Sequence, residues 1–199
     1  MVSPIRPRIG VLALQGDVRE HLRVLEDLGA EAVRVRRPTE LEGVRGLVLP
    51  GGESSVIDRL TRTFGLREPL RAAIAAGMPV YGTCAGMILL ADRLEGAVAG
   101  QLTLGGLDVT VRRNAFGRQN ESFETELAVP ELGTVPVAAT FIRAPEVTAA
   151  GPAVSVLAEL PGGRIVAVEQ GPLLATAFHP EVSGENRFHR RLLERVLSS

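Results

Sequence analysis

The stretch Pro79-Val80-Tyr81-Gly82-Thr83-Cys84-Ala85-Gly86-Met87 contains the single cysteine of the 199-residue chain. A short apolar run leads into Gly-x-Cys-x-Gly, and the apolar residues that follow, Met87 to Ala91, are typical of the start of a buried helix. This order predicts a strand, a tight turn and a helix, which form the cysteine version of a nucleophile elbow. The elbow holds its central side chain exposed above a parallel sheet, and the flanking glycines permit strained dihedral angles and close approach of strand and helix.

Cys84 is expected at the N-terminus of the predicted helix, and this position affects its chemistry. Free backbone N–H groups and the positive end of the helix dipole favour the thiolate form of a cysteine side chain. Most lone cysteines are small buried residues that pack as hydrophobic groups. Inside this turn we instead interpret Cys84 as a nucleophile.

Composition narrows the classes of function. The length fits one domain, residues 1–199, with a sizeable core. The net charge of -1, from 22 Lys+Arg and 23 Asp+Glu, gives no support for a nucleic-acid surface or an acidic membrane. One cysteine excludes an internal disulfide and, without a His/Cys cluster, argues against a metal site. The apolar runs are too short for a signal core or a membrane span, so we expect a reducing, cytoplasmic setting.

The N-terminal half alternates strand-like and helix-like segments. Strands are predicted at residues 8–14, 32–35, 46–49 and 79–81. Helices are predicted between Asp17 and Gly29, over 56–63 and over 70–76, with Asp17 and either Ser54 or Ser55 as caps. This alternation predicts an α/β fold with a flavodoxin-like, doubly wound and mainly parallel sheet that is flanked by helices.

The pattern changes after Leu94, where strand-like segments follow one another with little helix between them. They lie at residues 107–111, 122–129, 137–142, 154–160, 165–168 and 173–178. We expect antiparallel additions that partly extend the sheet and partly fold over its end. A closing amphipathic helix is predicted over 185–197, with Phe188, Leu192, Leu193 and Val196 on its apolar face.

Two loops are candidates for binding. Pro50-Gly51-Gly52-Glu53-Ser54 follows a strand but lacks the Gly-Lys-Ser/Thr ending of a phosphate loop, while its two glycines can present backbone N–H groups to an anion. The polar insert at 112–120 is too charged for the core. It fits a solvated loop and a binding loop near the site equally well.

A thiolate that attacks a carbonyl needs a proton donor for the leaving group, and three histidines compete for this role. His179 follows an apolar run and precedes Pro180 and Glu181. Side chains two residues apart in an extended segment point the same way, so Glu181 can hold one ring nitrogen of His179. We interpret His21 as a packing residue beside a helix stripe, and His189, which lies among arginines, as solvent-exposed.

Gly-Thr-Cys-Ala-Gly, the Pro-Gly-Gly-Glu-Ser loop and His-Pro-Glu together resemble the class I glutamine amidotransferases over nearly the whole chain. Three longer strings, at 12–17, 113–119 and 141–145, resemble the glutaminase subunits of pyridoxal 5′-phosphate synthases. The resemblance implies a triad of Cys84, His179 and Glu181. It also implies an oxyanion hole from the amides of Gly52 and Ala85, and a set of glutamine-binding residues: Gly52, Glu53, Ser54, Arg113, Ile142 and Arg143. Ser55, where threonine is common, is a mild departure.

The resemblance also implies a reaction and a partner. L-Glutamine would be hydrolysed to glutamate and ammonia through a thioester, and ammonia would pass to a separate β/α-barrel synthase subunit that makes the vitamin B6 coenzyme. The chain itself would need no cofactor. We further expect weak activity without the partner, because the peptide between Gly51 and Gly52 can turn the oxyanion-hole N–H away at little steric cost. Two other classes stay open, a redox-sensing α/β module and a cysteine peptidase.

Overall fold

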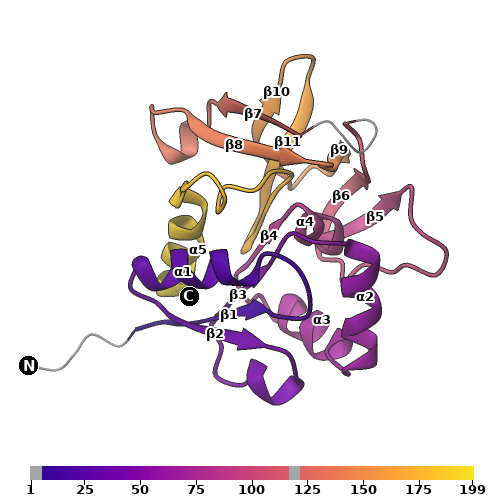
Figure 1. Ribbon diagram of the computed structural model, residues 1–199, viewed down its shortest axis with the longest axis vertical. Helices are drawn as coiled ribbons and strands as arrows, with labels where there is room; N and C mark the ends of the chain where they lie inside the picture. The colour runs from indigo at the N-terminus through magenta and orange to yellow at the C-terminus, as the bar shows by residue number, and fades with distance from the viewer. Residues whose placement is uncertain (1–5, 117–121) are drawn as a thin grey trace, which may run out of the picture.

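The computed structural model describes residues 6–116 and 122–199 of the chain. The part of the polar insert from 117 to 120 lies outside the described residues. A central mixed sheet runs through the molecule in the strand order β2-β1-β3-β4-β12-β11-β9-β6-β5, and β10 pairs with β11. Helices α1 and α5 lie on one side of the strands in Figure 1, and α2 and α3 lie on the other.

The parallel part of this sheet carries the elbow. Its strands are β1 (Arg8–Leu12), β2 (Glu31–Val35), β3 (Gly46–Leu49), β4 (Val80–Thr83) and β12 (Leu173–Thr176). All four neighbouring pairs among them are parallel, and all four residues of β3, β4 and β12 are buried, as expected for strands covered on both faces. The predicted mainly parallel α/β sheet is therefore confirmed.

Helices cover the two faces of the parallel strands. They are α1 (Val18–Asp27), α2 (Ser54–Thr63), α3 (Arg67–Ala75), α4 (Ala85–Leu90) and α5 (Arg187–Ser198). The predicted apolar face of α5 is confirmed, because Phe188, Leu192, Leu193 and Val196 are all buried. None of the helices in the described ranges is long and apolar enough to cross a membrane.

The C-terminal half adds mainly antiparallel strands, as expected. They are β5 (Ala91–Glu95), β6 (Leu107–Arg112), β7 (Ser122–Leu127), β8 (Val137–Ile142), β9 (Glu146–Ala150), β10 (Ser155–Leu160) and β11 (Arg164–Gln170). Only β5 and β6 pair in parallel here. β7 and β8 form a separate two-stranded sheet above the main one (Figure 1), and two short 3-10 helices lie at Pro38–Leu41 and Pro130–Leu132. β5 and β9 were not predicted, because much of their surface is polar and exposed.

The expected helix caps were wrong. Asp17 precedes α1 but makes no side-chain cap hydrogen bond. Neither serine caps α2; Glu53 occupies that position, and its carboxylate accepts a hydrogen bond from the backbone N–H of Ser55. Asp17 follows β1 and Glu53 follows β3, so both acidic residues lie at the carboxyl ends of parallel strands. Ligands bind at these strand ends in sheets of this kind.

Candidate active site

The elbow at Cys84 has the expected strand, turn and helix. Cys84 has φ 47° and ψ -100°, and its backbone N–H donates to the carbonyl of Thr176 at 2.8 Å. A Cβ atom on Gly82 would come within 2.5 Å of the carbonyl carbon of Gly86, and one on Gly86 within 2.1 Å of the carbonyl oxygen of Leu49. Both glycines are therefore required by close backbone packing.

The expectation that Cys84 stands exposed was wrong. Only 7% of the residue is exposed. Cys84 instead lines a small pocket of ≈ 40 Å³ with Asn114, Ile88 and the six residues that the resemblance assigns to glutamine binding: Gly52, Glu53, Ser54, Arg113, Ile142 and Arg143. The fold thus brings residues from three distant segments to the segment that carries the sulfur.

His179 and Glu181 follow the end of β12, beside the elbow. The Nδ1 atom of His179 lies 2.9 Å from Oε1 of Glu181, and the backbone N–H of His179 donates to the carbonyl of Thr140 at 2.9 Å. Burial lowers the pKa of His179, but hydrogen bonds with Asp17, Cys84 and Glu181 outweigh it and raise the pKa above its usual value. Burial also raises the pKa of Glu181. Nδ1 is thus held by a carboxylate, which leaves Nε2 for the sulfur.

Sequence reasoning missed Asp17, which lies next to the same imidazole. Its Oδ2 atom is 3.2 Å from Nδ1 of His179. Asp17, His179 and Glu181 offer potential metal-ligand atoms within 4.8 Å of one another, but direct hydrogen bonds already account for this distance, and we assign no metal to them. No signal in the sequence links residues so far apart in the chain.

The expected roles of the other two histidines need correction. His189 is fully buried, because it lies on the inward face of α5 with Leu193 and Val196 while its arginine neighbours point elsewhere. Its Nε2 atom is 2.8 Å from Nδ1 of His21, which is also fully buried and approaches Thr83 Oγ1 at 3.2 Å and Glu181 Oε1 at 3.4 Å. Burial lowers the pKa of both rings, that of His189 to about 4, so both are neutral at pH 7. His21 is therefore a polar support behind Glu181 rather than a simple packing residue.

Backbone strain concentrates at this pocket. Within residues 6–116 and 122–199, the non-glycine residues with positive φ are Cys84, Asn114 and Arg143, and all three line it. Such conformations cost of order 1–3 kcal/mol each and persist where the surrounding structure enforces them, often at functional sites. Asn114 was missed by sequence reasoning, although asparagine is one of the residues that tolerate this conformation.

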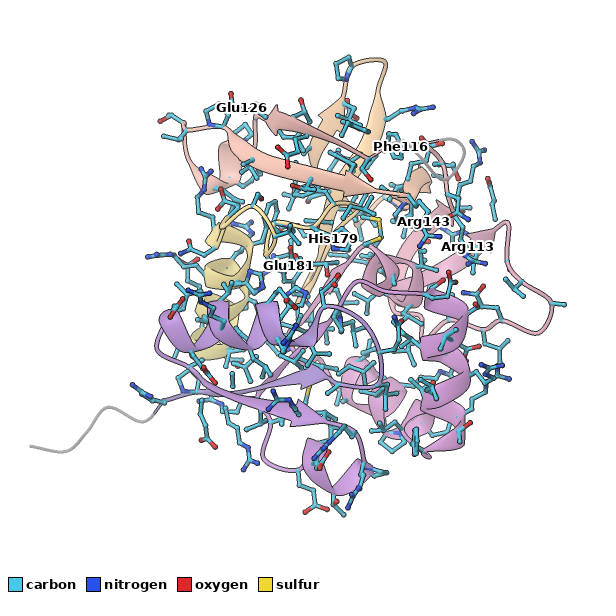
Figure 2. All side chains as sticks on the ribbon, in the orientation of Figure 1. Arg113, Phe116, Glu126, Arg143, His179 and Glu181 are labelled. Atoms are coloured by element: carbon cyan, nitrogen blue, oxygen red, sulfur yellow. The ribbon has the colours of Figure 1, made fainter. Side chains whose placement is uncertain are left out.

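Two of the three charged residues of the pocket, Arg113 and Glu53, are paired with each other. Arg113 donates to Glu53 Oε1 at 2.7 Å and to Gln101 Oε1 at 3.0 Å, and its side chain is only 9% exposed. Arg143 lies near Arg113 in Figure 2 and is exposed. Of the two open interpretations of the polar insert, the position of Arg113 favours the binding loop.

The Gly51–Gly52 loop is hydrogen-bonded to the turn that follows β1. The backbone N–H of Glu53 donates to Gln15 Oε1 at 2.8 Å, and that of Asp17 donates to the Gly51 carbonyl at 3.2 Å. A Cβ atom on Gly16 would come within 1.7 Å of that carbonyl oxygen. The orientation of the Gly51–Gly52 peptide therefore depends on the turn at Gln15 to Asp17.

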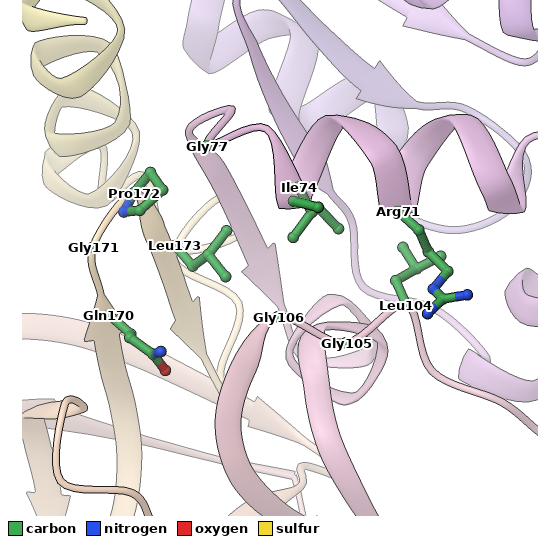
Figure 3. A pocket seen from close by; sticks show the side chains of 11 residues that line it. Arg71, Ile74, Gly77, Leu104, Gly105, Gly106, Gln170, Gly171, Pro172 and Leu173 are labelled. Atoms are coloured by element: carbon green, nitrogen blue, oxygen red, sulfur yellow. The ribbon is translucent and has the colours of Figure 1, made fainter.

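A larger pocket of ≈ 490 Å³ lies away from this chemistry. Arg71 and Ile74 of α3, Leu104 to Gly106, and Gln170 to Leu173 line it (Figure 3). Leu173 begins β12, whereas His179 follows the end of that strand, so this pocket is at the opposite end of the sheet. Size alone therefore does not locate the reactive site.

Comparison with solved structures identifies the class of protein. The chain is similar to a crystal structure described as a glutamine amidotransferase, with a TM-score of 0.88 and 47% sequence identity over 94% of this chain and 98% of that one. The structure of PurLQS from Thermotoga maritima has the same fold, with a TM-score of 0.70 and 17% identity over 98% of this chain and 99% of that one. The fold is that of the glutamine amidotransferases.

The family is more specific. The chain belongs to the SNO glutamine amidotransferase family, whose model matches residues 11–198. It is 67% identical over 190 residues to the pyridoxal 5′-phosphate synthase subunit PdxT of Leifsonia xyli subsp. xyli, covering 96% of each chain. It is 63% identical over 202 residues to the subunit of the same name from Kineococcus radiotolerans, covering 98% of this chain and 97% of that one.

Proposed function

We propose that this chain is the glutaminase subunit of a pyridoxal 5′-phosphate synthase and works as a single amidotransferase domain. It hydrolyses L-glutamine to glutamate and ammonia. The observation that carries the proposal is the pairing of His179 with Glu181 at 2.9 Å beside the Cys84 elbow. Cys84 itself lines a pocket that also holds the paired charges of Arg113 and Glu53. We infer the synthase as the partner from the names of relatives that are 60–67% identical to this chain.

The chemistry begins with the Cys84 thiolate and the imidazolium of His179. The sulfur attacks the side-chain carbonyl carbon of glutamine, and the backbone N–H groups of Gly52 and Ala85 stabilise the resulting oxyanion. The C–N bond then breaks while His179 gives its proton to the departing nitrogen, so that ammonia and a thioester form. His179 next takes a proton from water while the water oxygen attacks the thioester carbon. The C–S bond then breaks, which restores the Cys84 thiolate beside the His179 imidazolium and frees glutamate, whose carboxyl proton goes to solvent.

Glu181 and the pocket charges have separate tasks in this scheme. Glu181 keeps Nδ1 of His179 protonated, so that Nε2 faces the sulfur and the leaving group. Glutamine carries an α-carboxylate and an α-ammonium group, and we assign the first to Arg113 and Arg143 and the second to Glu53. Arg113 and Glu53 bind each other at 2.7 Å and so occupy this space themselves. This accounts for a pocket of ≈ 40 Å³, well below the roughly 300–1,000 Å³ of common ligand sites.

The ammonia has an acceptor in the partner subunit. Waste of glutamine is avoided if the isolated chain is a poor enzyme, and we expect the synthase to raise the turnover number by about tenfold or more by fixing the orientation of the Gly51–Gly52 peptide. The turn at Gln15 to Asp17 contacts this loop directly and is the natural place for such an effect.

The decisive experiment measures glutamate release by the full chain with and without the synthase subunit, at concentrations where complex formation is verified. We expect Cys84→Ala and Cys84→Ser to abolish hydrolysis while circular dichroism and the melting temperature stay unchanged. A glutamine-like diazo-ketone should label the parent chain once, at its single cysteine. Substantial turnover in Cys84→Ala would reject the proposed nucleophile, and hydrolysis of peptides in place of glutamine would favour the peptidase interpretation.

A further inference from the structure

A second carboxylate reaches the imidazole of the triad. Oδ2 of Asp17 is 3.2 Å from Nδ1 of His179, and Oε1 of Glu181 is 2.9 Å from the same nitrogen. One ring N–H therefore lies between two acidic side chains. They differ in environment, because the Asp17 side chain is 40% exposed whereas that of Glu181 is completely buried.

The Asp17 side chain has no helix-capping role that would explain its position. It precedes α1 without making a cap hydrogen bond, and its structural contact to the Gly51 loop is made by its backbone N–H. The side chain instead packs on Gly51 together with the ring. A Cβ atom there would come within 3.0 Å of Asp17 Oδ2 and within 2.2 Å of His179 Cε1. The absence of a side chain at Gly51 thus allows the carboxylate and the imidazole to meet.

The other ionisable groups around His179 show what the Asp17 charge adds. The Cys84 side chain forms a hydrogen bond with the His179 ring, and the Glu181 carboxylate lies at Nδ1 of that ring. Behind Glu181 are His21 and then His189, whose pKa values are lowered by burial, so neither adds charge at pH 7. Burial works against the charged form of Glu181 and raises its pKa. Contact with solvent makes a full negative charge on Asp17 less costly to maintain.

We propose that Asp17 is a positioning residue, which shares Nδ1 of His179 with Glu181 and keeps the ring in its imidazolium form beside Cys84. The ring remains a proton donor for the departing ammonia at higher pH than Glu181 alone would allow. The pKa of His179 is raised, in accord with this contact. The inference rests on the proposed glutaminase function, because it assigns a task within that reaction.

The test compares Asp17→Asn with the parent in two measurements. The asparagine side chain has the shape of the aspartate side chain and can still accept a hydrogen bond from Nδ1–H of His179, but it carries no charge. No helix-capping hydrogen bond is lost, because the Asp17 side chain makes none. We expect the alkaline limb of kcat/KM for glutamine, measured in the complex with the synthase, to move down by about one pH unit, as for loss of one nearby opposite charge. The proton NMR titration of the Cε1–H of His179 in the full chain alone should move by the same amount. The KM for glutamine should change little.

Two variants serve as controls. Asp27→Asn makes the same chemical change on the exposed surface at the end of α1 and should move neither curve. Asp17→Glu retains the charge and should keep both curves close to those of the parent. Parent-like curves for Asp17→Asn, or an NMR shift without a change in the kcat/KM profile, would overturn the proposal. Failure of the glutaminase assignment is detected separately by activity that survives Cys84→Ala, and the NMR titration still judges the Asp17 contact in that case.

Discussion

Replacing Gly51 by alanine should damage catalysis while the chain stays folded. Gly51 has no positive φ, so its backbone conformation accepts alanine. The new Cβ would lie 2.2 Å from Cε1 and 2.8 Å from Nδ1 of His179, and the ring has to retreat by about 1.2 Å to restore ordinary contact at 3.4 Å. The ring is held by Glu181 and Asp17 and cannot move without lengthening those hydrogen bonds.

The size of the effect follows from this displacement. A misplacement of about 1 Å in a catalytic group costs roughly 10²-fold in rate, or about 3 kcal/mol in the activation free energy. We therefore expect kcat for glutamine hydrolysis to fall by about 10²-fold or more, with a much smaller change in KM. Overpacking at a single site costs about 1–3 kcal/mol of folding free energy, so the variant should remain folded.

The assay is glutamate release by the complex, paired with urea denaturation of the full chain. Gly77→Ala is the reciprocal control, because Gly77 has φ +86° and its Cβ would meet no atom of the described residues within 4 Å. That variant should lose about 1 kcal/mol of stability and keep its kcat. Full kcat in Gly51→Ala would refute the argument that close packing on Gly51 positions the imidazole.

Three further outcomes follow from the same geometry. Glu181→Gln should lower kcat by about 10⁴-fold with little change in KM, and a collapse of affinity with intact kcat would make Glu181 a binding residue instead. Arg113→Ala should raise KM by about 30-fold or more, Arg143→Ala should raise it less because Arg143 is exposed, and unchanged kinetics in both would remove the proposed clamp. His21 and His189 have pKa values lowered by burial, so the unfolded chain binds more protons than the folded chain below pH about 6.5; the free energy of unfolding, measured by urea denaturation, should fall as pH drops below that value, by up to about 1.4 kcal/mol per pH unit for each ring, while the raised pKa of His179 makes it fall as pH rises above that value.

The elbow and the parallel strands could be predicted because their signals are local. A buried run, two glycines around a cysteine and a second buried run decide the geometry within nine residues, and the structure differs only in the depth at which Cys84 lies. His179 and Glu181 were also predicted as a pair from a short string, but the reason given was wrong: Pro180 and Glu181 lie in a turn, and alternation along an extended segment does not produce their contact.

One error concerns the face of a helix, and the other concerns a contact between distant segments. His189 was assigned to solvent from its charged neighbours, although its spacing to Leu193 and Val196 places it on the buried stripe of α5. Attention to helical spacing rather than to adjacent residues would have found it. Asp17 was assigned to a cap because aspartate is common there, and its contact with His179 depends on the packing of two loops that no local pattern describes.

The two halves of the sheet contribute different parts of the proposed reaction. Pairing of Leu49 with Gly82 and of Thr83 with Thr176 ends β3, β4 and β12 at one level, so the register brings the Gly51 loop, Cys84 and His179 together. Arg113 and Arg143 follow the antiparallel strands β6 and β8, and a hydrogen bond of 3.0 Å from Ala115 N–H to the Ala144 carbonyl ties their two loops. Substitutions of Gly51, Cys84 and His179 in the parallel part should therefore act on kcat, whereas substitutions of Arg113 and Arg143 should act on KM. A loop variant that lowers kcat alone would contradict this division.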